Sequence, residues 1–97
     1  MFIILLRFSA NKSEAARLME RHNAWLKRGF DDGAFMLAGS LRPEGGGAIL
    51  AQGMARDELM ARLQQDPFVA EDVVRVELHE VAPGQVDERL AFLKAAA

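Results

Sequence analysis

The first strand that the sequence predicts carries apolar side chains on both of its faces. Residues 2–8, FIILLRF, are a short run of strand-forming residues. Because successive side chains of a strand point to opposite faces, Ile3 and Leu5 share one face, and the other face carries Phe2, Ile4, Leu6 and Phe8. A chain of 97 residues without cysteine has no disulfide, so packing alone must stabilise it. Packing therefore has to cover both faces of this strand.

The periodicity of the remaining sequence predicts one α+β domain over residues 1–97. Asn11 lies three residues before Glu14, a capping-box spacing that begins a long helix, and Gly33 ends that helix. A second helix over residues 55–65 has its apolar stripe at Leu59, Met60 and Leu63. Strands are expected at residues 2–8, 34–41, 47–52 and 72–82, with a glycine-rich turn at 42–46 and a short terminal helix within 85–97.

This order, βαββαβ followed by a helix, is that of the ferredoxin-like fold, an antiparallel four-stranded sheet with both main helices on one face. Two helices cover only one face of the sheet, whereas the first strands are apolar on both. A sheet face left exposed would be an unusually large apolar patch for a monomer. We therefore expect a homodimer in which two sheets pack face to face. A charged residue in place of Ile4 or Leu6 is then expected to dissociate or unfold the protein.

Composition argues against several classes of function. Twelve Lys and Arg against 14 Asp and Glu give a net charge of −2, so no basic excess indicates a nucleic-acid partner. No apolar stretch approaches the roughly 20 residues of a membrane helix. Arg7 interrupts the N-terminal apolar run too early for a secretory signal, so we expect a cytoplasmic protein. Without cysteine, and with only His22 and His79 as histidines, we expect neither a metal nor a cofactor.

His22 is the first candidate for chemistry. It lies on the apolar stripe of the first helix, one turn after Leu18 and one turn before Leu26. One interpretation is a core histidine that is hydrogen-bonded to a backbone carbonyl. The other is a general acid–base, because histidine is the side chain that titrates near neutrality. The second interpretation requires an acceptor that orients the ring.

Asp66 is the best candidate for that acceptor. It precedes Pro67, which disfavours helical geometry at Asp66, so the second helix should end there. One interpretation is an aspartate that caps the turn that follows. The other follows from the fold, in which the two helices lie side by side. An aspartate at the end of the second helix would then meet His22 and fix the tautomer and orientation of the imidazole ring.

Three further residues are candidates for binding a polar ligand. Arg7 is a cation in an otherwise apolar strand, where it either reaches water or binds a substrate carboxylate. Ser40 and Arg42 follow the second strand and add a hydroxyl group and a second cation at one end of the sheet. Together these residues suggest that the ligand is a small anionic molecule.

These residues also carry a resemblance that covers nearly the whole chain. The sequence resembles the YCII-related (YciI-like) family of the dimeric α+β barrel fold, in which ferredoxin-like subunits pair as dimers. The resemblance rests on the aliphatic first strand and on the segments RHNAWL at 21–26, LAGSL at 37–41, AIL at 48–50 and DPFV at 66–69. It implies that His22 and Asp66 are the candidate catalytic pair. The sequence departs from many relatives at Ser40, where a proline is common.

The resemblance and the residues together suggest a small cofactor-independent enzyme. His22 would move a proton on a small organic acid or cyclic substrate in an elimination or isomerisation, as in related dehydrochlorinase- and muconolactone-isomerase-like enzymes. Asp66 would orient His22, and Arg7, Ser40 and Arg42 would hold polar substrate groups. Two alternatives remain open. One is a cofactor-free monooxygenase, and the other is a non-catalytic ligand-binding or interaction module in which His22 and Asp66 only pack and cap.

Overall fold

Four strands form one antiparallel sheet in the order β2-β3-β1-β4. The structure, a computed structural model, describes residues 1–95. The strands are β1 (Phe2–Phe8), β2 (Phe35–Ser40), β3 (Gly47–Ala51) and β4 (Val74–Glu80). The helical segments are η1 (Lys12–Glu14), α1 (Ala15–Asp31), α2 (Arg56–Leu63), α3 (Pro67–Ala70), η2 (Glu88–Leu90) and α4 (Phe92–Ala95). The predicted ferredoxin-like α+β fold is confirmed.

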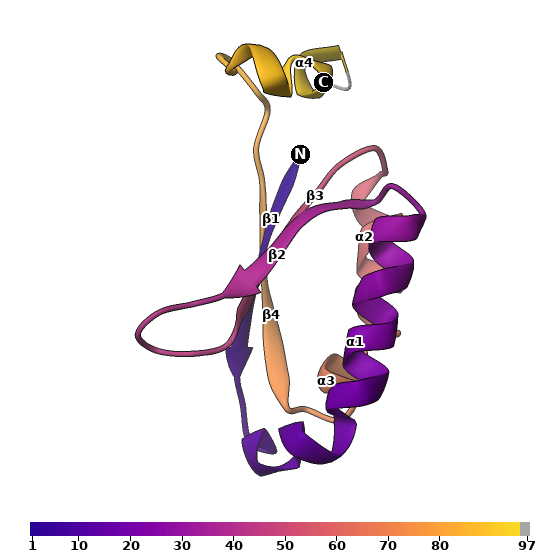
Figure 1. Cartoon of the computed structure of the whole chain (residues 1–97), viewed down its shortest axis with the longest axis vertical. Coiled ribbons are helices and arrows are strands. Elements are labelled where there is room, and N and C mark those ends of the chain that lie inside the picture. The colour runs from indigo at the N-terminus through magenta and orange to yellow at the C-terminus, as the bar shows by residue number, and fades with distance from the viewer. Residues whose placement is uncertain (96–97) are drawn as a thin grey trace.

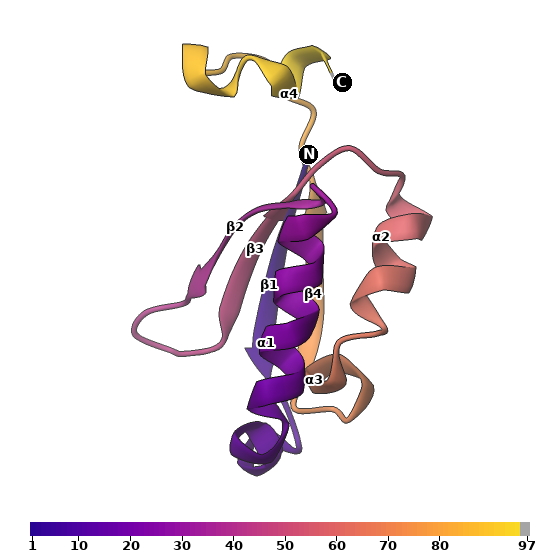
Figure 2. The ribbon, with the colours of Figure 1, turned by 45° about the vertical axis from the view of Figure 1, so that its right-hand side comes forward.

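Helices α1, α2 and α3 all lie on one side of the sheet (Figures 1 and 2). The core fills the space between this side and the helices. Ile4 of β1 and Ile49 of β3 are paired across the sheet and buried, and they face the buried Leu18 and Trp25 of α1. The indole N–H of Trp25 donates to the backbone carbonyl of Arg62 at 2.9 Å, which ties α1 to α2.

The opposite side of the sheet carries no helix in the described part of the chain (Figures 1 and 2). The strand register places Leu37, Leu50 and Ile3 in one row across β2, β3 and β1 on this open face. Leu5 lies in the next row, and Leu37 is half exposed. Ile4 and Leu6, by contrast, are buried on the helix-facing side. A charged residue at either position therefore tests folding, whereas the open face is tested at Ile3 and Leu5.

The expected capping box at the start of the long helix was wrong. The Asn11 side-chain amide donates to the backbone carbonyl of Glu71 at 2.8 Å, and the Glu14 carboxylate accepts from Arg17 at 2.9 Å. Neither Asn11 nor Glu14 makes a side-chain cap on the helix. The end of α1 follows the prediction, because Gly33 has a positive φ of 75° and its N–H bonds the carbonyl of Phe30.

The C-terminal segment differs from the single helix expected within 85–97. It forms two short segments, η2 and α4, set apart from the helices and the sheet (Figures 1 and 2). The Asp87 side chain accepts from the N–H of Arg89 and so caps η2. Leu93 is buried, whereas Leu90 and Phe92 are exposed. Residues 96 and 97 lie outside the described part of the chain. Within residues 1–95, no helix has the length and apolar character needed to cross a bilayer.

Gly46 brings the β2–β3 loop against the backbone of β1. Its φ is +86°, and a Cβ atom built on it would lie 2.3 Å from the carbonyl oxygen of Leu6. Gly45, with a φ of +83°, approaches the Phe8 ring, with the added Cβ at 3.1 Å. Only glycine avoids both the left-handed strain and the backbone clash at position 46. The predicted glycine-rich turn therefore packs its backbone directly against the backbone of β1.

Gly46→Ala should destabilise the fold more than Gly33→Ala. Both glycines have positive φ, but a Cβ at Gly33 meets no atom within 4 Å. Left-handed strain alone costs ~1–2 kcal/mol, so this is the expected loss for Gly33→Ala. The clash with Leu6 should add at least about 1 kcal/mol at Gly46. Urea unfolding of the two variants measures the difference, and equal losses would contradict the close approach of the loop.

Candidate active site

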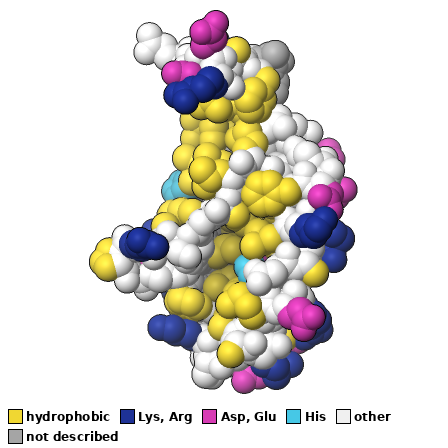
Figure 3. Space-filling view, viewed as in Figure 1, with side chains coloured by type: hydrophobic (Ala, Val, Ile, Leu, Met, Phe, Trp, Pro, Cys, Tyr) yellow, Lys and Arg dark blue, Asp and Glu magenta, His cyan; other side chains and the backbone are white. Residues whose placement is uncertain are grey.

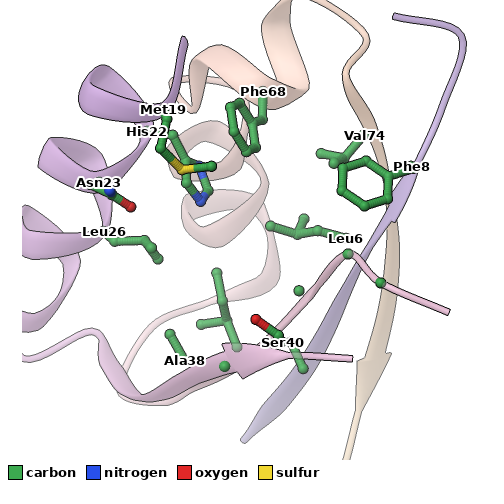
Figure 4. A pocket seen from close by; sticks show the side chains of 16 residues that line it. Leu6, Phe8, Met19, His22, Asn23, Leu26, Ala38, Ser40, Phe68 and Val74 are labelled. Carbon is green, nitrogen blue, oxygen red and sulfur yellow. The ribbon is translucent and has the colours of Figure 1, made fainter. Parts of the chain in front are cut away.

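A cavity of about 480 Å³ lies between helices α1 and α3 and the helix-facing side of the sheet. Its walls come from α1, from Phe68 of α3, from the ends of β1, β2, β3 and β4, and from the glycine-rich loop. Figure 3 shows hydrophobic side chains in the hollow between the β2–β3 hairpin and α1, with a histidine among them. The close view in Figure 4 shows the labelled side chains around this space. The space is large enough for a small organic molecule.

His22 lies on the inward face of α1 and borders this cavity (Figure 4). Its helix positions it one turn from the fully buried Leu18, so the ring points toward the core and is only 9% exposed. The Phe68 ring stacks on the imidazole with centroids 4.0 Å apart and planes inclined by 5°. Trp25 lies on the same helix with its ring centroid 5.9 Å from His22. These contacts hold the imidazole ring in one orientation.

Asp66 is fully buried and hydrogen-bonds His22 directly. Its Oδ1 atom is 2.8 Å from Nδ1 of His22 and also accepts from the backbone N–H of Phe68 at 2.9 Å. Asp66 is the N-cap of α3, and Pro67 occupies the first turn of that helix. Both interpretations of Asp66 are therefore met, because the same oxygen caps the helix and binds the histidine. The other oxygen, Oδ2, is buried without a hydrogen-bond partner among the described residues.

This hydrogen bond determines which ring nitrogen remains available. An ionised carboxylate only accepts, so Nδ1 of His22 carries the hydrogen that Asp66 binds. In the neutral ring Nε2 is then an acceptor. Nε2 makes no hydrogen bond within residues 1–95, and the ring faces the cavity in Figure 4. A ligand in the cavity therefore meets a base that a buried carboxylate orients.

Ser40 and Asn23 contribute the other polar side chains of the cavity wall (Figure 4). Ser40 ends β2, and the register places it opposite Gly47. Asn23 is not among the residues that the sequence predicted for the site. A signal was present, since Asn23 follows Met19 by four residues and precedes Leu26 by three, the spacing of one helix face. The stripe of Met19, Asn23 and Leu26 lies beside His22 on α1, and these residues border the cavity together with His22.

Arg7 and Arg42 do not border this cavity. Arg7 lies on the open face of the sheet, in the row that follows Leu5, and its Nε donates to Glu77 at 3.0 Å. Glu77 also accepts from Nε2 of His79 at 2.8 Å, and these bonds from His79 and Arg7 hold the pKa of Glu77 below its usual value. Arg42 is exposed in the β2–β3 loop. The structure therefore brings His22 and Ser40 to one cavity, with Asp66 buried behind His22, and separates both arginines from it.

No cluster of three His, Cys, Asp or Glu side chains suited to a metal ion occurs in residues 1–95. The chemistry that the described cavity residues themselves provide is acid–base chemistry at His22, supported by the Asp66 carboxylate. Neutral hydrogen bonding at Asn23 and Ser40 is available beside it.

Fold and cavity together define a small ferredoxin-like domain with a histidine–aspartate pair at a ligand-sized cavity. The sequence pattern of the YCII-related domain matches residues 1–82, and the chain therefore belongs to the YCII-related family. No functionally curated protein matches the sequence. A solved structure with the same fold is 5-chloro-2-hydroxyhydroquinone dehydrochlorinase (TftG) from Burkholderia phenoliruptrix AC1100, in complex with 2,5-dihydroxybenzoquinone. It is 14% identical, with a TM-score of 0.68 over 87% of this chain and 96% of that one.

The two histidines should be opposite tautomers when neutral. His22 donates from Nδ1 to Asp66, whereas His79 donates from Nε2 to Glu77. Long-range ¹H–¹⁵N correlation spectra distinguish the two tautomers from the nitrogen shifts. His79 serves as the internal control, because its exposed ring experiences the same solution conditions. A neutral His22 that carries its hydrogen on Nε2 would contradict the proposed orientation of the base.

Proposed function

We propose that this protein is a small enzyme that uses His22 as a general acid–base and Asp66 to position it. One observation carries the proposal: Nδ1 of His22 is bound at 2.8 Å to a fully buried carboxylate, which leaves Nε2 available to the cavity. A histidine kept only for packing needs no oriented nitrogen beside a cavity of about 480 Å³. Membership of the YCII-related family is consistent with this assignment.

The proposed reaction is an elimination or an isomerisation of a small organic molecule. In both, Nε2 of His22 takes a proton from a C–H or O–H group of the substrate, and the electron pair of the broken bond forms a new C=C or C=O double bond. In an elimination a leaving group such as chloride departs with its bonding electrons. In an isomerisation the imidazolium returns the proton to another carbon. Asp66 stabilises the imidazolium in either case, because its carboxylate already binds Nδ1.

The dehydrochlorinase of similar fold supports this class of reaction. Its name describes the loss of hydrogen chloride from a hydroxylated aromatic ring, and its structure holds a dihydroxybenzoquinone. We therefore choose chlorinated hydroquinones as the first substrates to test. The main alternative function is a ligand-binding module without catalysis. The enzyme loses turnover when the imidazole of His22 is removed, whereas the binding module has no turnover to lose.

His22→Gln should reduce turnover at least about 10²-fold, because general acid–base catalysis contributes roughly 10²–10⁴-fold. Glutamine retains much of the packing volume, so the fold should survive. Chloride release from a panel of chlorinated hydroquinones, and deuterium exchange into their ring C–H positions in D₂O, measure the two reaction types. Asp66→Asn should reduce turnover less, since it removes the charge that stabilises the imidazolium but leaves the base.

His79→Gln is the histidine control because His79 does not border the cavity, and the mass of this variant is compared with that of the wild type because His79 pairs with Ile3 on the open face. It should retain the wild-type rate. Turnover by His22→Gln equal to that of the wild type would refute the mechanism. Neither chloride release nor deuterium exchange from any member of the panel in the wild-type protein would favour the binding module.

We also propose that the protein is a homodimer through the open face. Ile3, Leu5, Leu37 and Leu50 lie on this face. Leu37 is half exposed in the single chain, and a second sheet would bury this surface. The β4 side of this face is charged, because Arg7, in the row after Leu5, forms an ion pair with Glu77 of the edge strand β4. An apolar centre with a charged margin is the usual arrangement of an interface between copies of one chain.

Light scattering at micromolar concentration should give twice the 10.7 kDa mass of one chain. Leu5→Asp should dissociate the dimer and leave folded monomers, because Leu5 faces away from the core. Ile4→Asp should instead unfold the protein, because Ile4 is completely buried between the sheet and α1. A wild-type protein that has the mass of one chain at this concentration would overturn the proposed dimer.

A further inference from the structure

Among residues 1–95, those that line the cavity include no lysine, arginine, aspartate or glutamate. Its 16 residues are mainly aliphatic and aromatic side chains and glycines, and His22 is the one titratable side chain among them. Lys, Arg, Asp and Glu side chains in Figure 3 lie outside the hollow, on the outer side of α1 and at the margins. Nothing in the wall other than His22 can therefore supply a positive charge to a bound molecule.

The histidine does not supply a net positive charge either. With Asp66 ionised, the His22–Asp66 pair carries a total charge of −1 when the imidazole is neutral and of zero when it is protonated. An anionic ligand would gain no net countercharge from the residues of the wall, and Lys12, whose ammonium lies 4.7 Å from the centroid of the Phe8 ring, stands outside it. Burial of an unpaired carboxylate is strongly unfavourable. The balance of charges therefore disfavours the carboxylate ligand that Arg7 and Arg42 led us to expect.

The cavity does offer neutral hydrogen-bonding groups on two sides. Asn23 comes from α1 and Ser40 from the end of β2, and both side chains extend toward the space between them in Figure 4. Both residues are exposed, so their side chains are free to bind solvent or a ligand at the mouth of the cavity. The amide of Asn23 donates and accepts, and so does the hydroxyl of Ser40. Both suit the oxygen atoms of an uncharged ligand.

We propose that the cavity selects uncharged small molecules that bear oxygen substituents, and that Asn23 and Ser40 determine this specificity. The proposal rests on the same cavity as the proposed proton transfer and names its substrate class. The aliphatic wall binds the carbon skeleton, and the two polar side chains bind hydroxyl, carbonyl or amide groups at its edge.

A matched pair of probes tests the charge preference. 4-Hydroxybenzamide and 4-hydroxybenzoate have nearly the same shape, and at pH 7 they differ by one negative charge. Isothermal titration of the wild-type protein should give at least tenfold tighter binding for the amide. Equal affinity, tighter binding of the benzoate, or no binding of the amide at millimolar concentration would each overturn the proposal.

Two variants test the polar contacts. Asn23→Leu and Ser40→Ala should each weaken binding of 4-hydroxybenzamide roughly 2- to 10-fold, the effect of losing one net hydrogen bond. Ser13→Ala is the matched control, since Ser13 is exposed in η1 and does not border the cavity. Arg7→Met should also leave the affinity for both probes unchanged. Loss of benzoate binding in Arg7→Met would contradict the proposal, and so would full amide affinity in the Asn23→Leu, Ser40→Ala double variant.

The side-chain amide signals of Asn23 in ¹H–¹⁵N spectra report where the probe binds. They should shift when 4-hydroxybenzamide is added, and unchanged signals at saturation would contradict binding in this cavity. These binding measurements involve no chemistry. A catalytically inactive wild type that still prefers the amide would refute the proposed function and support this specificity. An active His22-dependent enzyme that prefers the benzoate would support the proposed function and refute this specificity.

Discussion

The hydrogen bond between His22 and Asp66 depends on a single carboxylate oxygen that does two things at once. Oδ1 of Asp66 caps α3 through the Phe68 N–H and accepts from Nδ1 of His22. Capping fixes the carboxylate at the start of α3, and Phe68 of that same short helix stacks on the imidazole. The ring is therefore held from its edge by Asp66 and from its face by Phe68, within three consecutive residues of the chain. Helix α1 docks on these residues, and the cavity forms beside the contact.

Much of the fold could be predicted from the sequence because its signals are local. The alternation in β1, the stripe of α1 and Pro67 each fix an element by steric preference and periodicity, and the structure confirms those elements. The capping box failed because Asn11 found a tertiary partner, the carbonyl of Glu71, which lies 60 residues away in the sequence. Local spacing contains no information about such a partner. The terminal helix failed for a related reason, since few contacts with the body of the domain specify its shape.

The residues of the candidate site show the same difference between local sequence signals and tertiary contacts. His22 and Asp66 were predictable as a pair because the fold packs the middle of α1 beside the start of α3, and the resemblance to the YCII-related family indicated the same two residues. The sequence predicts a ligand for Arg7 because a cation in an apolar strand needs either water or an anionic partner. Its alternation already placed it with Ile3 and Leu5, away from the helices that carry His22. Asn23 was missed because a polar residue on an exposed helix position is ordinary until the cavity beside it is known.

The glycine-rich loop gives one side of the cavity a wall made of backbone. At Gly46 any larger residue would collide with the Leu6 carbonyl, so the wall cannot be reshaped by a side chain at this position. Ala38 and Ser40 on the neighbouring strand and Asn23 on α1 carry no such restriction. Divergence among proteins of this architecture would then concentrate on one strand and one helix face, while the loop stays constant. One side of the cavity is backbone whose shape is fixed at Gly46, and the other is formed by side chains that can be exchanged. A change of substrate would then require substitutions at only a few positions.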